Sequence, residues 1–278
     1  MFGSVYSKYP EILLDSFGEM KKDYEKKIKV SSSSSLIILM QKIYIGIFGI
    51  PEIGFQVRSM HFKDLQKNIK KKNINKILDA GSGIGAYTFW LSKIYPKAKV
   101  DGFDIDKGKL EFSKSFAKEL GFKNAKFYYA DISKGKGRNK YDLIVNVDVL
   151  EHINNYKKTL SNFYNLLNNS GYLYIHTPQL NQIRIFKQLN KWYHEDHARE
   201  GFDPEKLKKE LESLGFKTIK SRNTFGSFGS LAWELNHLLL SKSLFLAGIV
   251  YPLLLLIAQV DIFWKNKKGL GIAILAKK

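Results

Sequence analysis

Three glycines, Gly81, Gly83 and Gly85, stand close together directly after a short apolar run and directly before a segment with helical spacing. The carboxylate of Asp79 lies two residues ahead of them. A loop of glycines, which lack side chains, lets a nucleotide-containing cofactor approach the backbone closely. Gly81, Gly83 and Ala86 also fit the spacing of a dinucleotide-binding loop. A pyrophosphate at a helix N-terminus is best bound without a carboxylate nearby. Asp79 therefore favours a cofactor that carries positive charge.

Polar side chains also follow the next three apolar runs. Asp104 comes about 20 residues after the glycine loop, the spacing at which a carboxylate accepts hydrogen bonds from two ribose hydroxyls. Asp131 suits either an adenine amino group or a turn, and Asp106 directly precedes a helical segment, as an N-cap does. The fourth run is followed by Asn146, Asp148, Glu151 and His152. His152 and His176 are interpreted as structural residues.

A second group of reactive side chains lies in residues 191–202, KWYHEDHAREGF. Three roles are open for it: a metal site made by His194, His197 and a carboxylate, general base catalysis by a histidine, or a lid loop held by ion pairs. A loop with this spacing imposes no particular ligand geometry, so we predict no metal. We name His194 and His197 as the candidate catalytic residues.

An α/β sheet must position these residues, because short apolar runs alternate with amphipathic segments from Lys76 onward. Helices are expected at 86–95, 109–121, 157–168 and 204–215, the last one capped by Asp203. Strands are expected at 75–80, 98–105, 125–131, 141–147, 171–177, 216–222 and 271–278. In a doubly wound sheet ligands bind beyond the carboxyl ends of the strands, where the candidate residues stand.

The motifs ILDAGSGIG, GFDID, YYADI, YDLIVNVDVLEHI and GYLYIHTP follow one another in this order. Together they resemble the successive motifs of class I S-adenosylmethionine-dependent methyltransferases, in particular the branch with ubiquinone, menaquinone and other small-molecule or lipid methyltransferases. The resemblance covers about residues 74–222 and the last strand. It implies a Rossmann-like doubly wound sheet of seven strands with helices on both faces, and S-adenosyl-L-methionine as the cofactor.

The resemblance also implies roles for the strand-end residues. The glycine loop and Asp79 would hold the methionine end, Asp104 the ribose, and Asp131 with Ile132 the adenine, while residues 146–148 would border the transferred methyl group. The full set of expected cofactor-binding residues is Asp79, Gly81, Ser82, Gly83, Gly85, Asp104, Ile105, Asp131, Ile132, Asn146, Val147 and Asp148. Methyl transfer from a sulfonium needs mainly proximity, orientation and a dry site.

Two segments fall outside the alternating pattern. We expect an N-terminal helical leader at 1–62, a core at 63–223 and 269–278, and an apolar insertion at 224–268. The insertion holds the uncharged segment Leu244 to Val260, which contains Pro252 and is flanked by Lys242, Trp264 and further lysines. This pattern favours a helix that lies in or dips into one leaflet of a membrane over a full span or a buried core helix.

The formal net charge of +19 attracts anionic lipid or nucleic acid. The chain has no cysteine, which excludes a disulfide scaffold, a thiolate nucleophile and a Cys-type zinc site. The N-terminus lacks the pattern of a signal peptide. We predict a cytoplasmic enzyme, peripheral at the inner face of the cytoplasmic membrane, that methylates a small-molecule or lipid acceptor. The alternatives are an RNA or protein methyltransferase, a non-catalytic cofactor-binding subunit anchored at the membrane, and a dinucleotide oxidoreductase.

Overall fold

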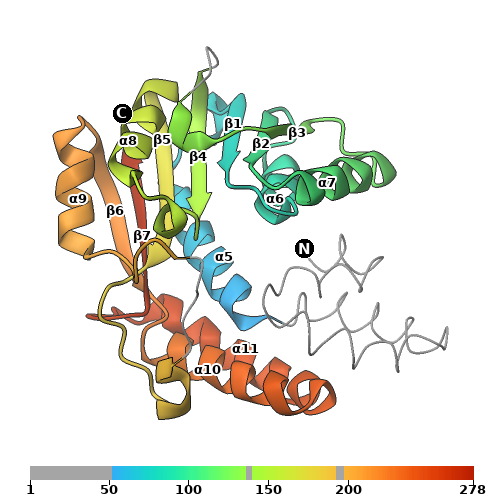
Figure 1. Ribbon diagram of the computed structural model, residues 1–278, viewed down its shortest axis with the longest axis vertical. Coiled ribbons are helices and arrows are strands. Elements are labelled where there is room, and N and C mark those ends of the chain that lie inside the picture. Colours follow the sequence, from blue (N-terminus) through green and yellow to red (C-terminus); the bar gives the residue numbers. More distant parts are fainter. Residues whose placement is uncertain (1–51, 136–139, 192–196) are drawn as a thin grey trace.

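The computed structural model describes residues 52–135, 140–191 and 197–278. Within these ranges one seven-stranded sheet has the order β3-β2-β1-β4-β5-β7-β6 (Figure 1). Its strands are β1 (Lys76–Ala80), β2 (Lys99–Asp104), β3 (Ala125–Tyr129), β4 (Tyr141–Val147), β5 (Leu167–Pro178), β6 (Lys217–Thr224) and β7 (Gly271–Lys277). The pairs among β1 to β5 are parallel, and β7 is antiparallel to β5 and β6. The predicted Rossmann-like sheet is confirmed.

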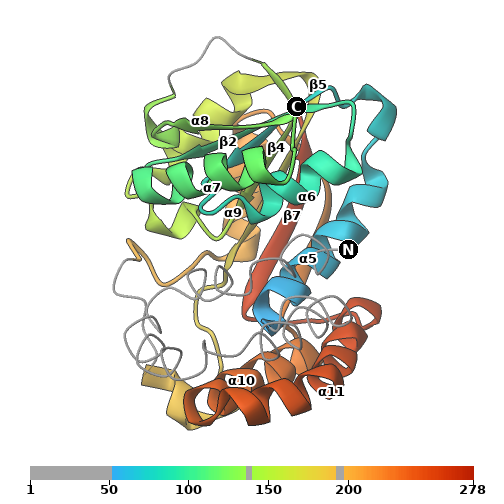
Figure 2. The same ribbon diagram turned by 90° about the vertical axis from the view of Figure 1, so that its right-hand side faces the viewer.

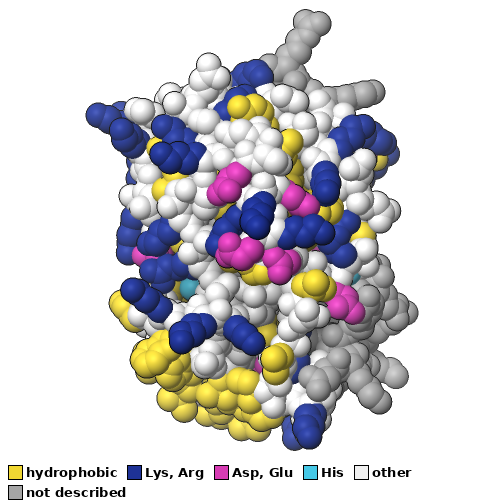
Figure 3. Space-filling model, turned by 90° about the vertical axis from the view of Figure 1, so that its left-hand side faces the viewer, with side chains coloured by type: hydrophobic (Ala, Val, Ile, Leu, Met, Phe, Trp, Pro, Cys, Tyr) yellow, Lys and Arg dark blue, Asp and Glu magenta, His cyan; other side chains and the backbone are white. Residues whose placement is uncertain are grey.

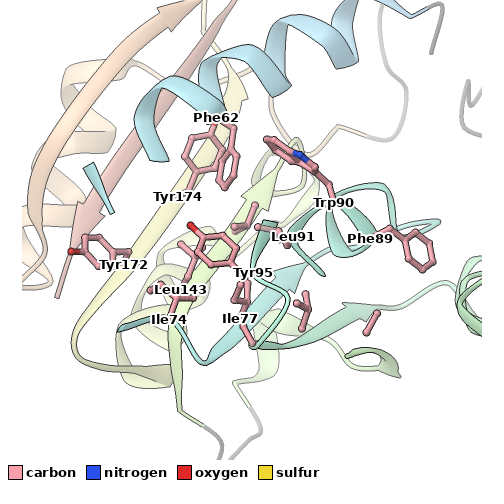
Figure 4. Packing of buried hydrophobic residues seen from close by; sticks show 14 of the residues in the cluster. Phe62, Ile74, Ile77, Phe89, Trp90, Leu91, Tyr95, Leu143, Tyr172 and Tyr174 are labelled. Carbon is pink, nitrogen blue, oxygen red and sulfur yellow. The ribbon is translucent and has the colours of Figure 1, made fainter. Parts of the chain in front are cut away.

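Both faces of the central strands are buried, as their near-continuous apolar sequences require, whereas the edge strands β3 and β6 keep exposed positions. Along β4, Leu143 and Val145 join one hydrophobic cluster, and Ile144 joins the other. The first cluster includes residues of α5 (Ile53–Leu65), α6 (Ala86–Ile94) and α7 (Lys107–Glu119), and the second includes residues of α8 (Tyr156–Leu166) and α9 (Pro204–Ser213). Figure 4 shows Phe62 of α5 beside Tyr174 of β5, where the ring centroids are 4.5 Å apart.

Two predicted helix starts show what local sequence can specify, and one strand start shows what it cannot. The side chains of Asp106 and Asp203 accept hydrogen bonds from the backbone N–H groups of Lys109 and Lys206, so both predicted N-caps are confirmed. The fifth strand, however, begins at Leu167 and not at residue 171. It begins earlier because Leu167 pairs with Tyr141 across a register shift in β4, a contact that only the partner strand can specify.

Helix α5 crosses the predicted boundary between leader and core. Phe62 and Leu65 at its end pack in the first sheet cluster, whereas Ile53 and Val57 at its start pack in a third cluster. That third cluster is built largely from α10 (Ser227–Lys242) and α11 (Leu244–Phe263). Figures 1 and 2 show α10 and α11 as a layer beyond the end of the sheet toward which β4 points. The helix therefore joins the insertion to the core.

Helix α11 continues through Asp261 to Phe263, beyond the uncharged segment that the sequence singles out. Asp261 is buried, and its carboxylate accepts hydrogen bonds from the backbone N–H groups of Gly226 and Gly229 at 3.2 and 3.1 Å. It thus caps the start of α10. His61 of α5 also lies 3.2 Å from this carboxylate. An acidic residue next to an apolar run here marks a contact between helices.

Candidate functional site

The glycine loop adopts the left-handed backbone that its composition requires. Gly81 has φ +87°, and a Cβ at this position would lie 2.3 Å from a methyl carbon of Val149. Gly83 has φ +53°, and a Cβ there would meet nothing within 4 Å, so the loop leaves open space at this point. The N–H groups of Gly81 and Ser82 donate to the carbonyl of Phe103 at 2.8 and 2.9 Å, which fixes the loop to β2.

Asp104 lies at the end of β2, directly beside the glycine loop. Its Oδ2 accepts a hydrogen bond from the N–H of Gly83 at 2.7 Å, and its Oδ1 accepts one from the N–H of Asp106 at 2.9 Å. The side chain is half-buried, and the neighbouring Ile105 is 66% exposed. A carboxylate oriented by two backbone groups beside an exposed apolar side chain is a suitable place for a ribose and a base.

Asp131 follows β3 and takes part in a turn. Its Oδ1 accepts hydrogen bonds from both the N–H and the hydroxyl of Ser133, at 2.9 and 2.6 Å, and Lys134 lies 3.4 Å from its Oδ2. The turn alternative considered for Asp131 is therefore present in the structure. Ile132 packs against the second sheet cluster. Adenine recognition by this pair stays a prediction.

Asp79 is buried at the end of β1, with 2% of its surface exposed. The hydroxyl of Thr88 on α6 donates to its Oδ2 at 2.6 Å. Burial raises the pKa of Asp79 to about 7, despite the opposing hydrogen bonds from Thr88. The carboxyl group can therefore carry a proton near neutral pH.

We expect the melting temperature of Asp79→Asn, relative to the unchanged protein, to rise between about pH 4 and about pH 7. Because the pKa of Asp79 is raised in the folded protein, its protonation stabilises the fold fully below about pH 4. That stabilisation is lost as the pH rises through the folded-state pKa of about 7. Asparagine does not titrate and still accepts from Thr88. Thermal unfolding across this range tests the assignment, and a difference that is independent of pH would contradict it.

Two polar residues at the end of β4, Asn146 and Asp148, contact other strands and helix α5. Asn146 is fully buried and donates to the carbonyl of Ala80 at 2.8 Å, so it holds β4 against the end of β1. Asp148, after the half-buried Val147, has a positive φ of 51°. Its carboxylate forms an ion pair with Nε of Arg58 on α5 and lies 2.6 Å from Nδ1 of His176 on β5.

The protonation of this group follows from its surroundings. Burial raises the pKa of Asp148, but Arg58 and His176 outweigh it and hold that pKa well below its usual range. Burial lowers the pKa of His176 despite the charge of Asp148. An ionised carboxylate only accepts, so Nδ1 of His176 carries the hydrogen, and Nε2 accepts from the hydroxyl of Thr224 at 2.9 Å. His176 is thus a positioning residue for Asp148.

A cavity of about 730 Å³ opens next to Asp148. Asp148 is the one expected cofactor residue that lines it, among the residues that the structure describes. The cavity extends from the ends of β4 and β5 to the insertion, where Phe225 and Trp233 form part of its wall. The guanidinium group of Arg184 lies 4.7 Å from the centroid of the Trp233 ring. Apolar and cationic groups therefore share one wall of the cavity.

Of the two candidate catalytic histidines, His197 lines this cavity and His194 lies outside the described residues. Arg58 and Glu151 line the cavity too, although Arg58 is far from the other site residues in the sequence. Arg58 stands alone in the expected leader, and only the packing of α5 brings it to Asp148. Burial raises the pKa of Glu151 to about 8, and the charge of Asp148 adds to this effect.

Comparison with known proteins matches residues 70–221 to a family described as a methyltransferase domain. (S)-Coclaurine N-methyltransferase of Thalictrum flavum subsp. glaucum is 27% identical over 104 residues, 37% of this chain and 29% of that protein. Malonyl-[acyl-carrier protein] O-methyltransferase of Bacillus anthracis is 28% identical over 102 residues, 37% of each chain. This chain thus aligns with only about a third of each relative. The crystal structure of coclaurine N-methyltransferase bound to N-methylheliamine and SAH shares the fold, with TM-score 0.56, 14% identity and coverage of 80% of this chain and 72% of that one.

Proposed function

This chain belongs to the class I S-adenosylmethionine-dependent methyltransferases, and from this premise we propose that it methylates a lipophilic small molecule or lipid-linked acceptor at a membrane surface. S-adenosylmethionine is the cofactor, and the residues at the predicted site fit it. The glycine loop leaves open space at Gly83, and the Asp104 carboxylate lies within hydrogen-bonding distance of the same loop.

The cavity at the strand ends is the observation that carries the proposal. It borders the expected methyl position at Asp148 and reaches the apolar insertion at Phe225 and Trp233, with Leu270 beside them. Arg58 and Arg184 also line it. A cavity with an aromatic wall and guanidinium groups suits an acceptor that has an apolar body and a polar or anionic head.

The surface of α11 supports the membrane part of the proposal. One side of this helix is buried against the rest of the protein. The residues on that side, at helical spacing, are Ala247, Tyr251, Leu254 and Ala258. The opposite side exposes Phe245, Leu246, Ile249, Leu253, Leu256, Val260 and Phe263, which we call the α11 stripe. Figure 3 shows a hydrophobic patch at this end of the molecule with Lys and Arg side chains above it. Such a stripe is large for a surface that only water covers.

Exposed lysines and an aromatic residue flank the α11 stripe. Trp264 is 60% exposed, and Lys265, Lys267 and Lys268 follow it. Tryptophan is typical of the membrane interface, and clustered lysines attract the anionic inner leaflet. One side of α11 packs on α10 and α5, which favours a helix lying in the interface over one that spans the bilayer alone. We therefore place the enzyme peripherally at the inner face of the cytoplasmic membrane.

The reaction needs a nucleophilic atom of the acceptor in line with the methyl group. S-adenosylmethionine supplies a methyl carbon activated by the sulfonium, and the electrons of the breaking C–S bond pass to sulfur as the acceptor's lone pair forms the new bond. The group formed by Arg58, Asp148 and His176 lies at the expected border between cofactor and acceptor. His197, one of the two histidines expected to be catalytic, lines the same cavity.

The test is transfer of labelled methyl from S-adenosylmethionine into a membrane-containing cell extract, followed by partition between organic and aqueous phases. We expect label in the organic phase, with much less label when the added protein is Asp104→Ala. Aqueous label that ribonuclease or protease removes would replace the proposal with an RNA or protein acceptor, for which the net charge of +19 is the argument. Absence of turnover would leave a cofactor-binding subunit without catalysis.

A further inference from the structure

Three side chains on the wall of the acceptor cavity have the composition of a metal site. Glu151, His152 and His197 each offer one ligand atom, and these atoms all lie within 4.8 Å of one another. Ligands about 2.1 Å from a common ion in a tetrahedral site stand roughly 3.4 Å apart. Glu151 is buried, His152 is exposed and His197 is partly buried, so the cluster lies between the core and the surface. Two imidazoles and one carboxylate are the ligands of an open catalytic zinc site.

The backbone that carries these three residues is fixed by hydrogen bonds between two distant segments. Arg199 donates to the carbonyls of Leu150, Ile153 and Asn154 at 3.0, 2.8 and 2.9 Å. The N–H of Ala198 donates to the carbonyl of Glu151 at 3.0 Å. These bonds hold His197 beside the short 3₁₀ helix η5 (Leu150–His152), and the rings of His152 and His197 meet edge to face with centroids 4.5 Å apart.

The carboxylate of Glu151 is also oriented from behind. The hydroxyl of Thr177 on β5 donates to its Oε2 at 3.0 Å, and both residues are buried. Metal-binding carboxylates in proteins are commonly held by an outer hydrogen bond of this kind, which contributes to metal affinity. The cluster therefore combines converging ligand atoms, a fixed backbone and a supporting partner, and it faces a cavity from which an ion can enter.

We propose that Glu151, His152 and His197 bind one divalent ion of the zinc type, with an open coordination position facing an oxygen atom of the acceptor. This inference rests on the proposed acceptor cavity and narrows the acceptor to one that carries a hydroxyl group. It replaces the expectation of no metal, which weighed His194 and His197 without the residues of η5. In this arrangement His197 is a ligand and not a base.

The consequence for the reaction is a more acidic acceptor. A divalent ion lowers the pKa of a coordinated hydroxyl, as it does for bound water. The hydroxyl proton passes to solvent, the oxygen lone pair forms the bond to the methyl carbon, and the C–S bonding electrons pass to sulfur. Atoms and charges balance without a further reactant.

Metal binding is measured directly on the full, tag-free chain after treatment with a chelator, with no cofactor or acceptor added. We expect calorimetry with Zn²⁺ and visible absorption with Co²⁺ to report one ion per chain. His152→Ala, which removes an exposed side chain, and Glu151→Gln should each weaken binding by about 100-fold or more, and Thr177→Val by about 10-fold. The matched control is His237→Ala on α10, which should bind as the unchanged protein does.

Absence of stoichiometric binding would overturn the inference, as would equal affinity in His152→Ala and the unchanged protein. An equal loss in His237→Ala would overturn it too. Thermal unfolding and cofactor affinity of each variant verify that it is folded. The proposed function fails separately: bound metal without label in the organic phase contradicts the lipid acceptor alone, and label in the organic phase without bound metal contradicts the metal site alone.

Discussion

Replacing Asp104 with alanine is expected to weaken binding of S-adenosylmethionine by about 3 kcal/mol, or roughly 100-fold in Kd. The predicted role of this carboxylate is to accept hydrogen bonds from both ribose hydroxyls. In the structure it also accepts from the N–H of Gly83 and so orders the glycine loop. The substitution removes both contributions. Calorimetric titration with S-adenosylmethionine measures the change.

The neighbouring Asp106 provides the matched control. Its carboxylate caps α7 by accepting from the N–H of Lys109 and is more exposed. Asp106→Ala should lower the free energy of unfolding by about 1 kcal/mol and leave the cofactor affinity unchanged. If Asp104→Ala binds the cofactor as tightly as the unchanged protein, the ribose assignment is wrong. If both variants lose affinity equally, the effect belongs to the local structure around α7.

The sheet was predictable because its strands β1, β4, β5 and β7 contain short apolar runs bounded by polar residues. Burial on both faces keeps these runs apolar, and helices at a different period separate them. The positions that differ depend on distant partners. Leu167 joins β5 because it pairs with Tyr141, and Asp261 stays helical because α10 supplies N–H donors to its carboxylate. No local pattern encodes either partner.

In the site, too, some features follow from local sequence and others depend on distant partners. The glycine loop and Asp104 are close in sequence to the strands that carry them, so their spacing alone indicated a common edge of the sheet. By contrast, Arg58 reaches Asp148 only through the packing of α5, and His197 reaches Glu151 and His152 only through the bonds of Arg199. Long-range geometry of this kind changes the interpretation of His197. From the sequence it is a candidate base, whereas its position beside Glu151 and His152 is the reason that we propose it as a metal ligand.

The apolar insertion leads to the second large effect. Changing Ile249, Leu253 and Leu256 together to glutamine should weaken binding to vesicles containing anionic lipid by about 3 kcal/mol, or more than 100-fold. These residues lie in the α11 stripe and are 60%, 59% and 61% exposed, so their loss should change the free energy of unfolding little. Sedimentation with liposomes measures the partition.

Entry of the α11 stripe into the bilayer and attraction of the lysines to lipid head groups depend differently on lipid charge. A second variant separates the two contributions. Changing Lys265, Lys267 and Lys268 to glutamine removes about 1 kcal/mol per lysine on anionic vesicles and nothing on neutral ones, and high salt should mimic it. The stripe variant, in contrast, should lose binding at every salt concentration. If the stripe variant binds as the unchanged protein does while the lysine variant is released, charge anchors the protein and the stripe is covered by another partner.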